Sequence, residues 1–528
     1  MTRWFPRHAR GWRQRSTDLA VVRLAYKWQA AIVVVLGMFM AVLDNTIVNV
    51  ALPRMQSAFH TDWQSVVWVA SAYFLSSAAV IPVTGYLGDR LGSKWVWVAS
   101  LAFFTGASAL CALAPTVGWL ITFRVIQGIG AGALFPLALA IAYREFPPTE
   151  RGPAAAVVGV PLLLAPTFGP TIGGYLTTTF DWQAIFLVNV PLGALGLILA
   201  IWVLRPDAPE IAAQGRGFDV MGLLLAMIGT LALVYAIDRA GTRGWGDSTV
   251  DGLLISGVLL LAGFTVYELR SRDPVMDVRL FREGAFTVSN IVSWAIGAVG
   301  FGSLFLIPFY FENVLGRSPL DTGIVLIPMG LAAAIAVAIT GRLYNRVGPR
   351  LLTMVGVGML ALGSIGFVSA GPHTDPWSLT PWLILRGAGF GMAGVPIQNL
   401  ALSVVSNVAM ARASSLFNVT RQIFAAVGVA GLSSYLTNRA AALVPQITVQ
   451  ARAGTGAAGA CVLATPQQLP AIRECLTRLV TADALNDTFF VVVLLTVATM
   501  LVCIFLGQDP ALKAARTVEA GEPEAAYG

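Results

Sequence analysis

Gly85-Tyr-Leu-Gly-Asp-Arg-Leu-Gly-Ser-Lys94 is one copy of a motif that occurs twice, the second being Gly341-Arg-Leu-Tyr-Asn-Arg-Val-Gly-Pro-Arg350. The copies share a glycine, a leucine, an arginine and a second glycine in register, and each follows a long apolar segment. An internal repeat at this separation predicts two related structural halves. A weaker echo matches Arg124, Gly128, Gly130 and Pro136 to Arg386, Gly389, Gly391 and Pro396.

The composition indicates a membrane protein. Of 528 residues, 56% are hydrophobic and only 12% are charged, whereas soluble globular proteins are about 25% charged. The mean hydropathy is +0.74, which excludes a disordered chain. The net charge of +7 is therefore interpreted through membrane topology, and no nucleic-acid partner is expected.

A transmembrane helix needs about 20 mostly apolar residues to cross roughly 30 Å of hydrocarbon. Fourteen segments meet this requirement, so we expect an all-α membrane protein with two pseudo-symmetric six-helix bundles and two inserted helices. The expected spans are 28–51, 65–84, 94–114, 117–143, 153–177, 183–204, 218–238, 250–267, 285–311, 321–341, 349–371, 380–404, 412–437 and 486–507.

The basic residues orient these spans. With both termini in the cytoplasm, 23 of the 34 Lys and Arg residues fall on the inner side, 8 on the outer side and 3 within spans. This bias follows the excess of basic residues in cytoplasmic loops. The expected divisions are a basic cytoplasmic tail (1–27), an N-terminal six-helix bundle (28–204), a linker with two extra helices (205–284), a C-terminal six-helix bundle (285–507) with a long outer loop (438–485), and a disordered cytoplasmic tail (508–528).

Five motifs resemble the major facilitator superfamily, specifically its fourteen-helix drug:proton antiporter branch. The resemblance spans nearly the whole chain and implies a proton-coupled multidrug exporter. Gln183, where the family often has arginine, and Asn345, in place of an acid, depart from the pattern. The motifs lie at Leu43–Pro53, Gly85–Lys94, Arg124–Gly128, Gly159–Gly174 and Asp181–Pro191.

Asp44 is the strongest candidate for proton coupling. A carboxylate in hydrocarbon is costly, so it usually faces a wet cavity or a partner. At 1.5 Å per residue, Asp44 lies about 12 Å and Arg124 about 10 Å below the outer face, so the two can pair. We expect Asp44 to take up a proton from outside and then to bind Arg124 or a cationic substrate less tightly. The alternative is a permanent structural ion pair.

The second half lacks a matching carboxylate, because the position 256 residues after Asp44 is Gly300. Coupling is therefore expected in the first half. Glu312, near the outer face, could pair with Arg386, about 9 Å inside that face, as a rim salt bridge that closes an outer gate. A second proton or cation site and a solvated helix end remain alternatives for Glu312.

The repeated loops suggest a conformational latch at the inner face, formed by Gly85, Asp89, Arg90, Gly92 and Lys94 with Arg346 of the second copy. Glycine allows close backbone approach, and Asp89 can contact a helix N-terminus or the basic residues. A tight turn that carries topology charges is the alternative.

The helix expected at 153–177 carries an antiporter motif. Its glycines and prolines favour kinks and close packing of the two halves. It can shape a path without binding substrate. The residues are Gly159, Pro166, Gly169, Pro170, Gly173 and Gly174.

A large, partly apolar cavity would suit the substrate. Arg421, near the midplane, could bind an anionic substrate group or form a helix-bridging hydrogen bond. Packing against lipid or protein, which is the more frequent role of a single aromatic residue, is the alternative for each aromatic candidate. The candidate lining residues are Tyr73, Trp294, Phe301, Phe305, Phe309, Gln398, Asn399, Asn418, Arg421 and Gln422.

Cys461 and Cys475 both fall in the long outer loop, where oxidising conditions allow a disulfide to persist. No metal-ligand spacing, phosphate-binding glycine loop or other enzyme signature is found, so neither metal nor cofactor is expected and an ion gradient should supply the energy.

These features predict a monomeric, multi-pass exporter of the bacterial inner membrane. It would exchange external protons for an amphipathic, drug-like small molecule, cationic or neutral. One alternative is an exporter of an endogenous lipid or secondary metabolite, and another is a non-transporting membrane receptor or scaffold.

Overall fold

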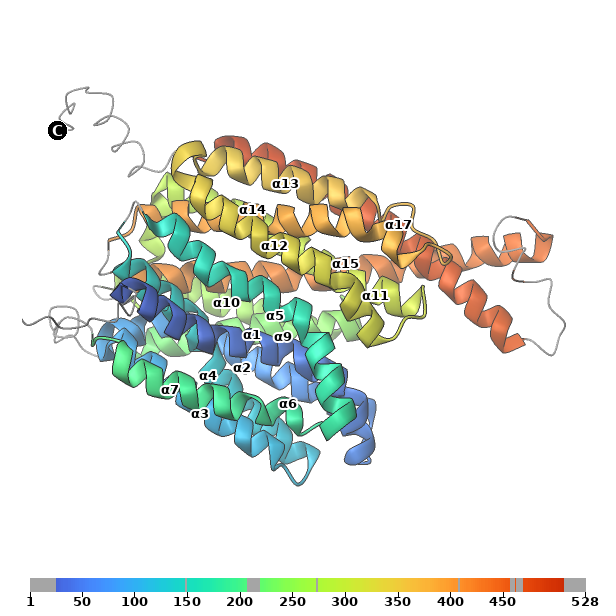
Figure 1. The fold of residues 1–528 in the computed structure, drawn as a ribbon. Coiled ribbons are helices and arrows are strands. Elements are labelled where there is room, and N and C mark those ends of the chain that lie inside the picture. The colour runs from blue at the N-terminus through green and yellow to red at the C-terminus, as the bar shows by residue number, and fades with distance from the viewer. Residues whose placement is uncertain are drawn as a thin grey trace, which may run out of the picture.

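A computed structural model describes residues 25–147, 150–206, 219–271, 274–406, 409–455, 461 and 469–507. Every regular element in these ranges is a helix, and the long helices run side by side (Figure 1). The expected tails at 1–27 and 508–528 lie outside the described residues, apart from residues 25–27.

The helices follow the order of the expected spans. Before residue 207 they are α1 (Tyr26–Ala58), α2 (Trp63–Leu91), α3 (Ser93–Ala112), α4 (Val117–Glu145), α5 (Arg151–Phe180), α6 (Ala184–Leu187) and α7 (Asn189–Val203). The middle of the chain forms α9 (Val220–Arg243), α10 (Ser248–Arg270) and the 3-10 helix η2 (Val278–Arg282). The remainder forms α11 (Gly284–Asn313), α12 (Pro319–Val347), α13 (Pro349–Ile365), η3 (Pro376–Leu379), α14 (Thr380–Ser403), α15 (Met410–Ala453), α17 (Leu469–Val502) and η6 (Cys503–Phe505).

Local sequence explains where several helices begin. The Asp62 side chain accepts a hydrogen bond from the Ser65 backbone N–H at 2.7 Å and caps α2, as acidic N-caps commonly do. Gly92 and Gly348, the second glycines of the repeated motif, have φ of 86° and 89°. Side chains disfavour this backbone conformation, so the two glycines form equivalent joints between α2 and α3 and between α12 and α13.

Eleven of the described helices are long and apolar enough to cross a membrane, fewer than the fourteen spans expected. Of the expected spans, α13 is a shorter apolar helix of 17 residues, and α5 and α14 are not among the eleven. Large apolar side chains cover outward surfaces, and Trp202 is 85% exposed. The chain is therefore a multi-pass membrane protein, because lipid rather than water suits such a surface.

The segment expected as an outer loop, 438–485, is helical for most of its described length. α15 continues to Ala453, and α17 begins at Leu469 rather than near 486. The 44 residues of α15 span about 66 Å, so the end of α15 projects beyond the bundle, together with the beginning of α17 (Figure 1). Polar residues such as Arg439 ended the apolar run in the sequence without ending the helix.

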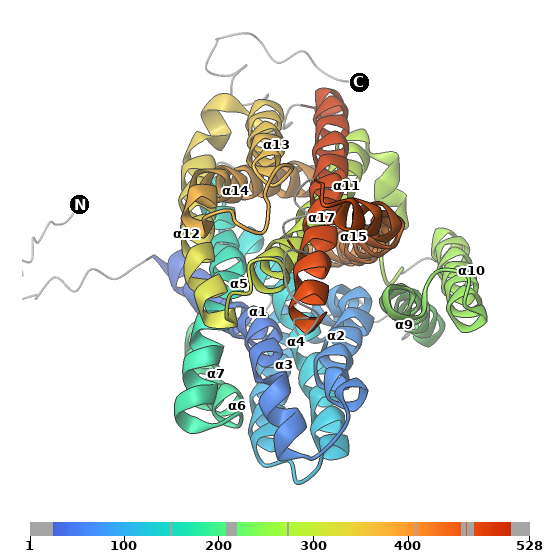
Figure 2. The same cartoon turned by 90° about the vertical axis from the view of Figure 1, so that its right-hand side faces the viewer.

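Packing brings distant segments together. α1 packs against α5, while α2 and α3 pack against α4; similarly, α12 and α13 pack against α14, and α11 packs against α15. α5 contacts α12, and α2 contacts α15, which joins early and late parts of the chain. α9 and α10 pair with each other at one side of the molecule (Figure 2).

Candidate functional site

Asp44 of α1 and Arg124 of α4 form an ion pair between Oδ2 and Nη1. Both side chains are fully buried. The other carboxylate oxygen of Asp44 accepts hydrogen bonds from Gln127 Nε2 at 3.0 Å and from Asn189 Nδ2 at 2.8 Å. The site therefore balances one positive and one negative charge away from solvent, and protonation of the carboxylate would leave the guanidinium charge unbalanced.

Arg124 is held from several sides. Its Nε donates to the Val69 carbonyl at 2.9 Å, and its Nη1 also donates to Gln127 Oε1 at 2.8 Å. The Tyr73 ring lies 4.1 Å from the guanidinium carbon, close enough for cation–π attraction. Arg124 thus has partners on α2 and α4 in addition to Asp44.

Ser108 of α3 links the two amides that contact Asp44. Its Oγ accepts from Gln127 Nε2 at 3.1 Å and from Asn189 Nδ2 at 3.2 Å, and donates to the Phe186 carbonyl at 3.0 Å. Ser108, Gln127 and Asn189 were not among the residues expected at this site. Gln127 and Asn189 nevertheless lie within two of the motifs, Arg124–Gly128 and Asp181–Pro191, and this position could have indicated a role at the site.

Arg386 of α14 is 3% exposed and has different partners. Its two terminal nitrogens donate to the hydroxyls of Ser303 and Ser364. The expected Glu312–Arg386 ion pair is not formed within the described ranges. Arg386 contacts α11 nine residues before Glu312, about 13 Å away along the helix axis, and Glu312 is exposed.

A second ionic cluster lies where α2 ends and α3 begins, which we call the α2–α3 end. Asp89 accepts from Arg144 Nη2 of α4 at 3.0 Å and from Arg412 Nε of α15 at 2.9 Å. A Cβ atom added at Gly85 would lie 2.5 Å from the Ala411 carbonyl oxygen. The absence of a side chain at Gly85 therefore lets α2 approach α15 closely enough for Asp89 to reach Arg412.

The other expected latch residues make different contacts. Arg90 stacks over the Tyr86 ring at 4.9 Å, and Lys94 Nζ donates to the carbonyls of Ile201 at 2.9 Å and Leu204 at 2.5 Å. Arg346 is exposed on α12. Lys94 thus satisfies carbonyl groups at the C-terminal end of α7.

A cavity of about 60 Å³ lies between early and late helices. Phe135 and Gly159 line it from α4 and α5, while Phe301, Gln398 and Arg421 line it from α11, α14 and α15. Typical ligand pockets measure about 300–1,000 Å³. The surrounding helices must therefore separate before a drug-sized molecule can enter.

The remaining substrate candidates lie outside this cavity lining. Trp294 stacks on Phe424 with ring centroids 4.7 Å apart. Tyr73 donates to the Ala41 carbonyl at 2.8 Å beside Arg124. Phe305 is 49% exposed and stacks against Phe309, and Gln422 is half-buried next to Arg421.

Two asparagines connect polar groups near the cavity. Asn399 accepts a hydrogen bond from the Tyr143 hydroxyl, which joins α14 to α4. Asn418 accepts from Arg421 Nη2 at 2.9 Å. These contacts give the two asparagines positioning roles in the observed arrangement.

The glycine-rich face of α5 packs against α1. A Cβ at Gly169 would overlap Thr46 Oγ1, and one at Gly173 would lie 2.8 Å from the Ile47 side chain. Gly174 approaches α12, where a Cβ added to this glycine would lie 3.9 Å from Leu320 Cδ1. The side chains of Pro166 and Pro170 lie outside the described part of the chain.

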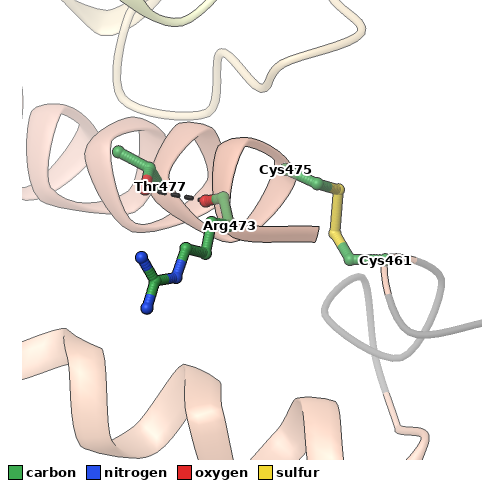
Figure 3. Close-up of a disulfide and its surroundings, with 4 residues drawn as sticks. All are labelled: Cys461, Arg473, Cys475 and Thr477. Carbon is green, nitrogen blue, oxygen red and sulfur yellow. Dashed lines mark hydrogen bonds between the residues drawn. A yellow bond between two sulfur atoms is a disulfide. The ribbon is translucent and has the colours of Figure 1, made fainter. Parts of the chain in front are cut away.

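Cys461 and Cys475 are joined by a disulfide beside the first turns of α17 (Figure 3). The bond closes a separation of 14 residues. No cluster of three or more metal-ligating side chains occurs in the ranges that the structure covers. The disulfide is well separated in sequence from the Asp44 and Arg386 sites.

Comparison with known proteins identifies the class of protein. Residues 34–429 match the model of the Major Facilitator Superfamily. The chain is 34% identical over 492 residues to "Multidrug resistance protein B homolog" of Mycobacterium tuberculosis, covering 91% of this chain and 90% of that protein. It is 29% identical over 418 residues to "Tetracenomycin C resistance and export protein" of Streptomyces glaucescens, covering 79% and 77% of the two chains.

A solved structure supports the same fold. The crystal structure of a double-tryptophan mutant of XylE aligns with a TM-score of 0.60 at 13% identity, covering 93% of this chain and 99% of that chain. Together with the relatives, this makes the protein a transporter of small molecules rather than an enzyme. The chain belongs to the major facilitator superfamily.

Proposed function

We propose that the protein exports amphipathic, drug-like molecules in exchange for protons by alternating access. The proposed architecture is two six-helix bundles at 28–204 and 285–507, with two extra helices inserted between them. The protein would act as a monomer in the bacterial inner membrane, with both termini and the α2–α3 end in the cytoplasm. The export of drug-like molecules is supported by the name of a relative, "Multidrug resistance protein B homolog".

The buried Asp44–Arg124 pair is the observation that carries the proposal. Ionisable groups within membrane helices commonly mark proton relays. A proton arriving from outside would neutralise Asp44 and weaken its attraction to Arg124. Release of that proton inside would restore the pair, so the two charge states favour different helix arrangements.

The inward movement of protons can supply the energy for export of substrate against its concentration gradient. One proton that moves inward through 100 mV releases about 2.3 kcal/mol, which supports a roughly fiftyfold gradient of a neutral substrate.

Substrate would enter when the α2–α3 end opens, which requires Asp89 and Arg412 to separate. The same two residues would pair again when the opposite face opens.

The test compares wild-type protein with Asp44→Asn in energised everted vesicles, using a panel of fluorescent amphiphiles that includes ethidium. We expect wild-type accumulation to be abolished by a protonophore, and Asp44→Asn to show no gradient-driven accumulation. Asp321→Asn, at the exposed start of α12, is the matched control and should retain transport. Gradient-driven accumulation by Asp44→Asn would refute the proton role.

A further inference from the structure

In the described part of the chain, the polar side chains that line the cavity are Ser293, Gln398 and Arg421, and the only charge among them is the positive charge of Arg421. Arg421 projects from α15, nine residues beyond Arg412, or about 13 Å further into the protein. No aspartate or glutamate lines the cavity among the described residues. The remaining lining is mostly apolar and aromatic, and includes Phe301, Phe390 and Phe417.

Arg421 has few partners for a group that carries five N–H donors. Its Nη2 donates to Asn418 Oδ1 at 2.9 Å, and its guanidinium carbon lies 5.3 Å from the Phe135 ring centroid. No ion pair between Arg421 and a carboxylate is found in the part of the chain covered by the structure. An unneutralised guanidinium inside a membrane protein is costly, and such residues commonly mark substrate pathways.

Gln398 supplies a second donor. It lines the same cavity from α14, and its Nε2 is buried without a hydrogen-bond partner in the described ranges. An unpaired buried donor is destabilising unless an acceptor reaches it. Gln398 Nε2 therefore lacks an acceptor and Arg421 lacks a counter-charge, and a ligand with negatively charged oxygens would supply both.

We propose that this cavity binds amphipathic anions, with a carboxylate or another acidic oxygen group at Arg421 and Gln398. The apolar body would lie against the phenylalanine rings once the helices separate. This inference rests on the proposed transport function. It favours the anionic group that the sequence allowed at Arg421 over the cationic or neutral substrate expected for the protein as a whole. A cation at this position would face the guanidinium instead.

Three probes that share one body test the charge preference. They are 11-(dansylamino)undecanoic acid, its methyl ester and its choline ester, which are anionic, neutral and cationic. Binding to the full chain is measured by dansyl fluorescence in nanodiscs of zwitterionic lipid, with empty nanodiscs subtracted. We expect the acid to bind about tenfold to a hundredfold more tightly than the methyl ester, as charge-assisted hydrogen bonds allow.

Variants assign the preference to the cavity. Arg421→Gln should remove the preference for the acid over the methyl ester. Arg421→Lys should retain part of this preference, and Gln398→Leu should reduce it severalfold. Arg452→Gln removes an exposed cation from the extension of the same helix and should leave it intact. Methyl ester binding reports whether each variant is folded.

The outcomes separate this inference from the proposed function, because binding needs no proton gradient. Equal affinity for acid and ester, an undiminished preference in Arg421→Gln, or binding of none of the probes would overturn the inference, whatever the flux assay shows. Addition of phosphatidylglycerol to the nanodiscs distinguishes the source of the acid. Displacement of the bound acid supports an anionic lipid as ligand, whereas retention supports an acid that arrives from water.

Discussion

Arg124 and Arg386 occupy corresponding places in the two repeated segments, yet only one of them has a carboxylate. Arg124 pairs with Asp44, whereas Arg386 bonds the hydroxyls of Ser303 and Ser364. The first site is neutral overall, and the second keeps one positive charge. Because a serine hydroxyl does not ionise near neutral pH, only the first of these two sites can change its charge by taking up a proton.

The contacts of the two arginines show which residue of α11 corresponds to Asp44 of α1. A fixed offset of 256 residues places Gly300 opposite Asp44, but the residue that contacts the second arginine is Ser303. The difference of three residues is close to one helical turn. Neither residue is acidic, so coupling through the first half remains the expectation.

The largest expected effect is on stability when one arginine is removed. Arg124→Met leaves the Asp44 carboxylate buried without its cation, which should lower the free energy of unfolding by about 3–5 kcal/mol. Transport should also be lost. Thermal unfolding of the full chain in nanodiscs measures the difference.

Arg386→Met is the matched control for that measurement. Ser303 also donates to the Gly300 carbonyl at 3.1 Å, and Ser364 to the Leu360 carbonyl at 2.7 Å, so both hydroxyls keep a partner. The variant loses two charge-assisted hydrogen bonds but also the desolvation cost of a buried guanidinium without a counter-charge, so the expected loss is below about 1.5 kcal/mol. Equal losses in the two variants would show that the carboxylate does not distinguish the sites.

The fold could be anticipated from apolar runs because hydrocarbon thickness constrains helix length strongly. The ends of α15 and α17 could not be found in this way. Outside the membrane a helix can continue through polar residues such as Arg439 and Gln446, since nothing there requires an apolar side chain. The outer segment was therefore expected as a loop, although much of its described length is helical.

The candidate site was only partly accessible from sequence. Helix depth placed Asp44 and Arg124 at the same level, and they are in contact. Counting residues from the expected helix ends placed Arg386 level with Glu312, but Arg386 contacts α11 at Ser303, about 13 Å from Glu312 along the helix, so the expected pair is not formed in this structure. The amides of Gln127 and Asn189 carry no charge, and their part in the network depends on rotational positions that sequence spacing does not fix.

The comparison extends to the repeated loops, where Gly85 lies against the α15 backbone. Gly85→Ala should cost about 1–3 kcal/mol in the arrangement with the α2–α3 end closed, because overpacking strains a close backbone contact. We expect the distance between spin labels on the ends of α2 and α15 to increase.

Gly106→Ala provides the control for this helix-packing change. A Cβ at Gly106 of α3 would meet no atom within 4 Å, so the label distance should stay at its wild-type value. An unchanged distance in Gly85→Ala would mean that the α2–α15 contact adapts without opening.

Ser303→Asp is the finest test of the comparison, because it gives Arg386 the kind of partner that Arg124 already has. The attraction between the new carboxylate and Arg386 should largely offset the desolvation of that carboxylate, so the net change in stability should be within about 1 kcal/mol. The charge at the second site would nevertheless become able to change with pH. We expect the number of protons exchanged per substrate, measured with a pH dye inside proteoliposomes, to rise above the wild-type value.

The double variant Asp44→Asn with Ser303→Asp tests whether a carboxylate beside the second arginine can restore coupling. If neither variant changes the proton count, a carboxylate beside a buried arginine is insufficient, and the amides around Asp44 must also be needed.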